Sequence, residues 1–378
     1  CGDCDYCQES SGGPAAGCQE WCESDISTNG KTRHCITDMK HLCGKCSYCT
    51  AAPTPKLEGV GRDRDITIKG RQVLVNGVPI HLKGVCWGPV PKGKDNQPDF
   101  KGYVQQDVKM MKEAGINAVR TYVPITDKSV LDVFWENKIW VIMVAHTEGS
   151  AHTYASDIAN VVNSLKDHPA ILMWSIGNEW NYNGMYDDMA FNDAVETVAH
   201  AAKIIKENDK TRPVSSIYGE VPDKWLIDKL WQVDAWGINV YRGIGFDDTF
   251  QKWAGRSGKP LYFGEYGADA WNAYQKRVDE HAQAKATRVL TEDIWKHSSV
   301  NLGGVTFGGF IFEWNDEWWK DGKGSVSNHD VGGIAPGGGP YPDKTFNEEY
   351  WGIVTIDRKK RKAFDALAEV QTPKDFAR

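Results

Sequence analysis

The chain has 378 residues, of which 41% are hydrophobic and 25% are charged, and its formal net charge is −7. The acidic balance argues against a nucleic-acid binder that works through a broad basic face. No apolar run approaches the roughly 20 residues that a membrane-spanning helix needs. The sequence starts at Cys1 without a basic and apolar leader, so we expect a mature or excised fragment.

Nine of the ten cysteines lie within the first 49 residues. This density is typical of a small domain held together by cross-links. An internal repeat is present as well, because CGDCDYC at 1–7 matches CGKCSYC at 43–49 at five of seven positions. We therefore predict a cysteine-rich repeat module over residues 1–49, a Pro/Thr/Ala-containing linker over 50–56, and a second domain over 57–378.

Two kinds of cross-link fit the cysteine-rich module. Disulfides are favoured because nine cysteines exceed the four ligands of one zinc site, although CxxCxxC together with His34 and His41 leaves zinc open. Disulfides predict an oxidising compartment, so we expect the protein to be secreted or attached to a cell wall. The module has no acid/base constellation of its own, and we expect residues 1–49 to serve binding or attachment to the cell wall.

From residue 66 onward the sequence alternates between strand and helix patterns. Residues 66–80 predict a hairpin with Asn76-Gly77 as its two-residue turn. Eight buried strands are then predicted at 81–88, 118–124, 140–146, 171–179, 213–219, 234–241, 260–267 and 308–316. Amphipathic stretches predict helices between and after them, among them 103–115, 129–138, 189–208 and 362–370.

Eight strands that alternate with helices over about 300 residues are typical of a (β/α)8 TIM barrel. A doubly wound open sheet is the competing α/β architecture. It would normally carry a glycine-rich phosphate loop after its first strand, and GVCWGP at 84–89 is not such a loop. We therefore predict an α/β fold, a TIM barrel preceded by the small disulfide-rich module.

The carboxyl ends of barrel strands face the active site, so the residues at these ends are the candidate site residues. They are Trp87, Arg120, His146, Asn178, Glu179, Tyr241, Glu265 and Trp314. Glu179 and Glu265 end the fourth and seventh strands, on opposite sides of the mouth. Two carboxyl groups that flank one bond are what glycosidic cleavage requires: one protonates the leaving oxygen and the other attacks the anomeric carbon.

Two of these strand ends carry a family resemblance. WSIGNEW at 174–180 together with PLYFGEYGAD at 260–269 resembles the signature pair of clan A retaining glycoside hydrolases. The segment VLVNGVPIHLKGVCW at 73–87 resembles the start of the catalytic barrel of glycoside hydrolase family 2. The resemblance implies that Glu179 is the general acid/base and that Glu265 is the nucleophile.

The resemblance also implies roles for the neighbours of the two carboxylates. Asn178 would bind the sugar 2-hydroxyl, and Arg120 and Tyr241 would donate hydrogen bonds that hold Glu265 ionised. Sugar contacts are expected from four further residues, with Trp314 as the floor of the −1 subsite: Trp314, His146, Trp87 and Trp180. Core packing or internal ion pairing is the structural alternative for all of these neighbours. The mechanism needs no metal ion and no organic cofactor.

The sequence says less about the substrate. Sixteen tryptophans and a long glycine-rich loop over 319–352 favour a carbohydrate groove, because indole rings stack on sugars. Only the hairpin and the cysteine-rich module precede the barrel in the given sequence, so we expect an open cleft and a polysaccharide substrate. By analogy with other clan A enzymes the leading prediction is a β-glucan, particularly a β-1,3-linked one, cleaved by water or transferred to a sugar. β-Mannanase and β-galactanase or β-galactosidase activities remain open.

A non-catalytic cell-wall carbohydrate-binding protein is the alternative of another class. A barrel that has lost its activity would be expected to have lost at least one member of the site. Both carboxylates are present in this sequence, together with Asn178, Arg120 and Tyr241. The sequence therefore favours an enzyme.

Overall fold

The computed structural model describes residues 65–146, 157–320 and 338–371. The predicted cysteine-rich module (1–49) and linker (50–56) lie outside these residues. Within the described ranges, no helix combines the length and the apolar character needed to cross a membrane.

A small antiparallel sheet of three strands precedes the barrel: β1 (Ile66–Lys69), β2 (Gln72–Val75) and β3 (Val78–Pro79). Val75 pairs with Val78, so Asn76 and Gly77 form the predicted two-residue turn. Both turn residues have positive φ, 51° and 79°, as the common hairpin turn requires. The predicted hairpin is therefore confirmed, and β1 adds a third strand to it.

Eight parallel strands close into a barrel in the order β11-β14-β4-β5-β6-β7-β8-β9, which confirms the predicted fold. They are β4 (Leu82–Cys86), β5 (Ala118–Arg120), β6 (Trp140–His146), β7 (Ile171–Ile176), β8 (Val214–Gly219), β9 (Ala235–Asn239), β11 (Leu261–Tyr266) and β14 (Thr306–Ile311). Nearly every residue of these strands is buried, because side chains fill the interior and helices cover the outside.

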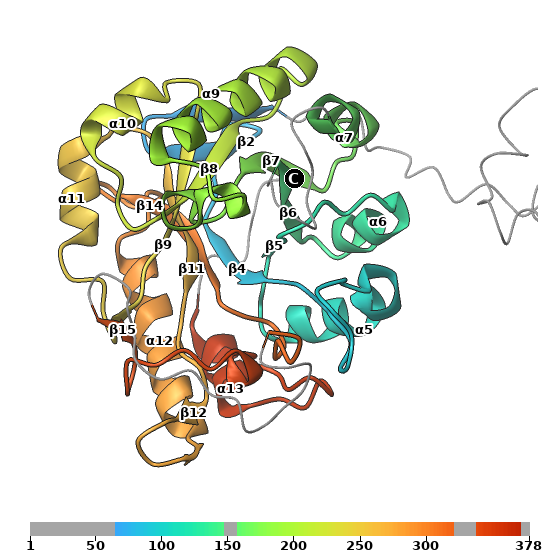
Figure 1. The fold of residues 1–378 in the computed structure, drawn as a ribbon, viewed down its shortest axis with the longest axis vertical. Coiled ribbons are helices and arrows are strands. Elements are labelled where there is room, and N and C mark those ends of the chain that lie inside the picture. Colours follow the sequence, from blue (N-terminus) through green and yellow to red (C-terminus); the bar gives the residue numbers. More distant parts are fainter. Residues whose placement is uncertain (1–64, 147–156, 321–337, 372–378) are drawn as a thin grey trace, which may run out of the picture. The chain divides into compact units, whose positions relative to one another are not determined.

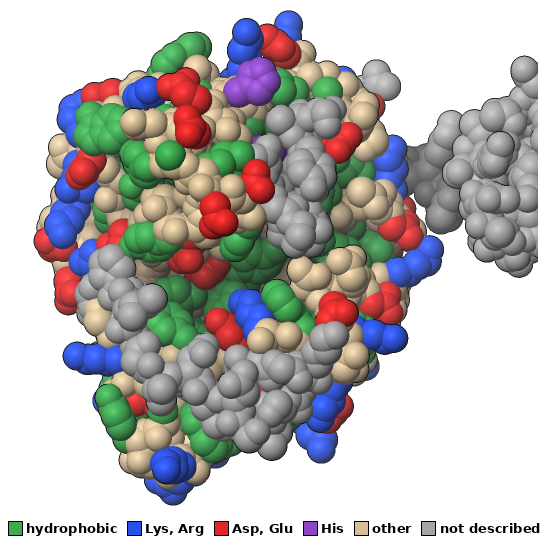
Figure 2. All heavy atoms as spheres, in the orientation of Figure 1, with side chains coloured by type: hydrophobic (Ala, Val, Ile, Leu, Met, Phe, Trp, Pro, Cys, Tyr) green, Lys and Arg blue, Asp and Glu red, His purple; other side chains and the backbone are tan. Residues whose placement is uncertain are grey.

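The principal helices form a ring around the strands (Figure 1). They are α5 (Phe100–Glu113), α6 (Lys128–Glu136), α7 (Ile158–Leu165), α9 (Phe191–Asn208), α10 (Lys224–Lys229), α11 (Thr249–Arg256), α12 (Glu280–Lys296) and α13 (Lys362–Glu369). Figure 2, from the same direction, shows that this face is hollowed near its centre, with hydrophobic, acidic and basic side chains around the hollow.

Shorter helical turns and two-stranded ladders lie in the segments that connect the barrel strands and helices. The helical turns are α8 (Trp180–Asn183), η3 (Gly184–Tyr186) and η4 (Glu348–Tyr350). Two small ladders pair β10 (Arg242–Gly243) with β15 (Gly339–Pro340) and β12 (Trp271–Asn272) with β13 (Arg277–Val278). The turns α8 and η3 directly follow Glu179, so they border one of the two candidate carboxylates.

A buried ion pair joins α5 to the C-terminal part of the chain. Both carboxylate oxygens of Asp107 accept hydrogen bonds from Arg358, at 2.9 and 3.1 Å. The indole N–H of Trp87 donates to the same carboxylate at 2.9 Å. All three side chains are almost fully buried, so Asp107 balances the charge of Arg358 inside the protein.

Candidate active site

Glu265 lies in β11 near its carboxyl end, and three side chains donate hydrogen bonds to its carboxylate. Oε1 accepts from Nη1 of Arg120 at 3.0 Å and from the hydroxyl of Tyr122 at 2.8 Å. Oε2 accepts from the hydroxyl of Tyr241 at 3.0 Å. The predicted contacts of Arg120 and Tyr241 with Glu265 are therefore present, and Tyr122 is an additional donor.

The donors keep their protons in this environment. Burial, followed by nearby groups that include Glu265, raises the pKa values of Tyr122 and Tyr241 well above the usual range. Burial opposes the charge of Arg120, but Tyr122, Cys86 and Glu265 raise its pKa well above the usual value. The carboxylate of Glu265 therefore faces one cation and two neutral phenols, all of which stabilise its charged form.

Glu179 has a different environment at the end of β7. Its Oε1 accepts one hydrogen bond, from Nδ2 of Asn239 at 3.1 Å. Burial, and next the negative charge of Glu265, raises the pKa of Glu179 to about 7. Glu179 therefore holds its proton near neutral pH, whereas the contacts of Glu265 favour its anion.

A chain of hydrogen bonds connects the two carboxylates. Oδ1 of Asn178 accepts from Nη2 of Arg120 at 2.6 Å and from Nδ2 of Asn239 at 3.0 Å. Arg120 also binds Glu265, and Asn239 also binds Glu179. The network thus joins residues at the carboxyl ends of β5, β7, β9 and β11, and a shift of one side chain would disturb both carboxyl groups.

The local backbone of the Gly177-Asn178-Glu179 turn explains how the second carboxylate is positioned. Gly177 has φ +68°, and a Cβ at this position would lie 2.8 Å from Cδ1 of Trp180. Glu179 has φ 48°, a left-handed conformation that is uncommon for a residue other than glycine. Its backbone N–H donates to the carbonyl of Ile217 at 3.1 Å, which ties the turn to β8.

Three of the predicted sugar-contacting tryptophans are instead buried packing residues. The ring of Trp87 lies 5.1 Å from that of Phe134, and its N–H binds Asp107, so it packs against helices α5 and α6. Trp180 donates to the hydroxyl of Ser216 and stacks on Phe191 at 5.9 Å.

Trp314 is also fully buried, and its ring lies 6.3 Å from Phe364 of α13. The predicted sugar contacts of Trp87, Trp180 and Trp314 are therefore corrected, because a fully covered indole offers no face to a sugar ring. Phe312, which follows β14, packs against one of the donors to Glu265. Its ring is perpendicular to that of Tyr122 at 6.3 Å.

His146 and Asn239 lie at the ends of two further barrel strands. His146 ends β6 and is fully buried, and its carbonyl accepts from the N–H of Gly177 at 2.7 Å. Asn239 ends β9 and contacts both Asn178 and Glu179, yet the sequence prediction omitted it. Its position two residues before Tyr241, as a polar residue at a predicted strand end, is the signal that would have identified it.

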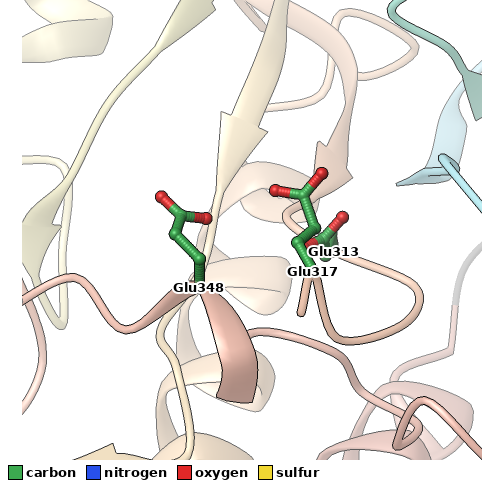
Figure 3. Close-up of side chains that lie close together, drawn as sticks. All are labelled: Glu313, Glu317 and Glu348. Carbon is green, nitrogen blue, oxygen red and sulfur yellow. The ribbon is translucent and has the colours of Figure 1, made fainter. Parts of the chain in front are cut away.

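Three further glutamates gather beside Phe312, where Glu313 and Glu317 follow β14 and Glu348 comes from η4 (Figure 3). One carboxylate oxygen of each lies within 4.8 Å of those of the other two, an arrangement that could hold a cation. The ammonium of Lys320 contacts Glu317 and lies 3.2 Å from Glu348. Burial, followed by Glu317, raises the pKa of Glu313 well above its usual value.

Comparison with known proteins identifies the fold family. The family described as "Glycosyl hydrolases family 2, TIM barrel domain" matches residues 63–300. A β-glucuronidase of Paenibacillus borealis is 24% identical over 243 residues, which cover 55% of this chain and 38% of the relative. A β-mannosidase of Mus musculus is 23% identical over 249 residues, which cover 60% of this chain and 27% of the relative.

Solved structures agree on the fold. The β-D-glucuronidase structure of Dictyoglomus thermophilum superposes with a TM-score of 0.59 at 19% identity, covering 81% of this chain and 53% of that one. The galacturonate-bound β-galacturonidase of Eisenbergiella tayi gives 0.57 at 20% identity with the same coverage. The chain thus spans about a third of the first curated relatives and about half of these structures. The family match covers more than half of the chain, which therefore belongs to glycosyl hydrolase family 2 through its TIM barrel domain.

Proposed function

We propose that the protein is a retaining β-glycosidase that works by double displacement. Glu265 attacks the anomeric carbon as Glu179 protonates the departing glycosidic oxygen, which gives a covalent glycosyl-enzyme and a free leaving group. Water or a sugar hydroxyl then attacks the anomeric carbon, Glu179 takes its proton, and the bond to Glu265 breaks. The observation that carries this proposal is the contrast between a carboxylate held by three donors and a neighbouring carboxyl group with a pKa of about 7.

The neighbouring residues support each step. Arg120, Tyr122 and Tyr241 stabilise the anion of Glu265 before the attack and again when it leaves. Once Glu265 is an ester its negative charge is gone, so the pKa of Glu179 falls and Glu179 can act as a base. Asn178 is placed between the two carboxylates, where its amide can bind the sugar 2-hydroxyl.

The direct test replaces Glu265 by Ala. We expect turnover to fall by about 10⁴-fold or more, and added azide to restore it with an α-glycosyl azide as product. Glu220→Gln, which changes a different acid just after β8, is the control and is expected to keep most of the activity. Near-normal turnover by Glu265→Ala would contradict the assignment. Binding of carbohydrate by the native protein without turnover would favour the non-catalytic alternative.

The identity of the sugar that the enzyme releases is proposed on separate grounds. Relatives named as β-glucuronidases, β-mannosidases and a β-galactosidase support a β-linked glycone of one of these kinds. Cleavage of β-1,3-glucan remains a prediction that these names do not support. A product profile on laminarin, mannan, galactan and cello-oligosaccharides, together with aryl β-glucuronide, β-mannoside and β-galactoside, would decide among them. His146 is retained as a proposed contact of the glycone.

We propose an attachment role for residues 1–49 and, with it, a secreted or cell-wall location. The support is the density of cysteines, nine in 49 residues, and the repeat that they contain. Thiol titration of the protein under denaturing conditions, with and without reductant, would count the disulfides. Metal analysis of the same sample would test the zinc alternative.

A further inference from the structure

Two exposed aromatic side chains lie in the helical turns that directly follow Glu179. Tyr182 of α8 is 53% exposed and Tyr186 of η3 is 46% exposed. The predicted tryptophans near the mouth, Trp180 and Trp314, are buried, so these tyrosines provide the exposed rings of this segment. Large exposed aromatic surface next to a reaction centre is typical of a ligand-binding site.

The ring of Tyr182 packs against the backbone at the end of β8. It lies against Gly219 at the end of β8, where a Cβ would come within 2.2 Å of Cε2 of the ring. Asn181 fixes Gly219 with two hydrogen bonds, from Nδ2 to its carbonyl at 2.9 Å and from its N–H to Oδ1 at 2.7 Å. Gly219 therefore permits the close approach, and the ring of Tyr182 packs against the backbone while the residue stays 53% exposed.

Tyr182 also has a fixed position relative to the proposed chemistry. Its backbone N–H donates to the carbonyl of Glu179 at 2.8 Å, within the same helical turn. On the inner side of this segment, the hydroxyl of Tyr186 accepts from Nδ2 of Asn178 at 2.9 Å. Because a general acid must reach the departing oxygen, the leaving group has to pass beside Glu179.

We propose that Tyr182 is the stacking platform for the leaving-group sugar, which makes the substrate a β-linked oligo- or polysaccharide. This inference rests on the proposed function, since it takes Glu179 as the general acid. The flat ring of Tyr182 would cover the apolar face of a pyranose. The backbone at Gly219 packs against the ring and restricts its movement.

A second aromatic surface continues outward at the same end of the barrel. Phe191 is the first residue of α9 and Trp225 the second of α10, and their ring centroids are 6.2 Å apart. Both helices follow barrel strands, so their first turns lie at the carboxyl ends of the strands. Trp225 is 52% exposed, and the buried Trp180 supports Phe191 from beneath. A longer saccharide can therefore meet aromatic surface beyond the first sugar.

The test compares substrates with and without a leaving-group sugar. The first set contains β-glucuronyl, β-glucosyl, β-galactosyl, β-mannosyl and β-laminaribiosyl fluoride, whose leaving group is fluoride. The second contains the corresponding β-linked disaccharides and laminaritriose. We expect Tyr182→Ala to lower kcat/KM about tenfold on the saccharides and to leave the fluorides within about twofold. Tyr182→Phe keeps the ring and is expected to retain activity on both sets.

The control variant is Trp231→Ala. Trp231 is 70% exposed but follows α10, at the opposite end of the barrel, so its removal should affect neither substrate set. An equal loss on fluorides and saccharides, or no loss on saccharides, would overturn the platform. So would a native enzyme that turns over a fluoride but none of the saccharides. Failure on every fluoride would instead refute the proposed function itself.

Discussion

Arg120 shows how one side chain serves two partners. Its Nη1 donates to Glu265 and its Nη2 to Asn178, at 3.0 and 2.6 Å. A lysine ammonium has one nitrogen and cannot reproduce the planar fork that reaches both. We expect Arg120→Lys to lower kcat about 100-fold, because Glu265 loses a charged donor that stabilises its anion. Steady-state kinetics measure the loss, and a kcat within about threefold of the native value would contradict this role.

The pH dependence of activity should report Glu179. With a pKa of about 7 for this general acid, kcat/KM should fall as the pH rises above neutrality and Glu179 loses its proton. In Glu179→Gln the alkaline limb should disappear on β-glycosyl fluorides, which need no protonation. Measurement of kcat/KM from pH 4 to pH 9 checks both statements, and Glu113→Gln on α5 is the control that should keep the native profile.

The same group should affect stability in a defined direction. The pKa of Glu179 is raised from 4.5 to about 7 on folding, so the folded state holds the proton more tightly. This contribution is complete below pH 4.5 and is lost as the pH rises to 7. Glu179→Gln should therefore match the native protein at pH 4 and exceed its free energy of unfolding at pH 8 by about 1–3 kcal/mol. Urea unfolding at the two pH values measures the difference.

Sequence pattern located residues at strand ends better than it predicted the direction of their side chains. Arg120, Asn178, Tyr241 and both glutamates meet in one network: the strand pattern placed them at strand ends, and the family resemblance implied the contacts with Glu265. Trp87 follows Cys86, whose thiol faces Gly264 and Arg120 in the interior, so alternation turns Trp87 outward. Tyr122 lies two residues beyond the end of β5, where the strand pattern no longer specifies direction.

At the level of elements, the attachment of α5 depends on Asp107. We expect Asp107→Ala to lower the free energy of unfolding by about 3–5 kcal/mol, because it leaves the buried charge of Arg358 without a partner. The control is Glu113→Ala on the same helix, whose solvent-exposed pair with Lys360 should contribute little to the free energy of unfolding. Chemical denaturation of both variants tests the contrast, and equal losses would contradict it.

The helices differ in how clearly their hydrophobic pattern predicts them from the sequence. The predictions at 103–115, 129–138, 189–208 and 362–370 are confirmed as α5, α6, α9 and α13, with ends shifted by at most three residues. Helix α12 is longer than most of these, yet small and polar residues such as Gln283 and Thr287 lie on its buried face. Hydrophobic periodicity is weak in such a helix, because tertiary packing rather than an apolar stripe places it.

At the level of the whole molecule, the predicted division between attachment and chemistry can be tested by truncation. Deletion of residues 1–56 should leave kcat/KM on soluble substrates unchanged, since Glu179, Glu265 and their partners all lie after residue 100. The same deletion should abolish binding to insoluble cell-wall material. Sedimentation with wall fragments measures the binding, and a truncated protein that still sediments would contradict the attachment role.

The proposed catalytic residues and the three glutamates beside Phe312 come from different parts of the chain. Arg120, Asn178, Glu179, Asn239 and Glu265 lie within the family match of residues 63–300, whereas Phe312, Glu313, Glu317 and Glu348 all follow it. We therefore expect changes in the last quarter of the chain to alter substrate preference more than they alter the reaction itself. The acids that carry the reaction and the acids beside Phe312 can therefore change independently of one another.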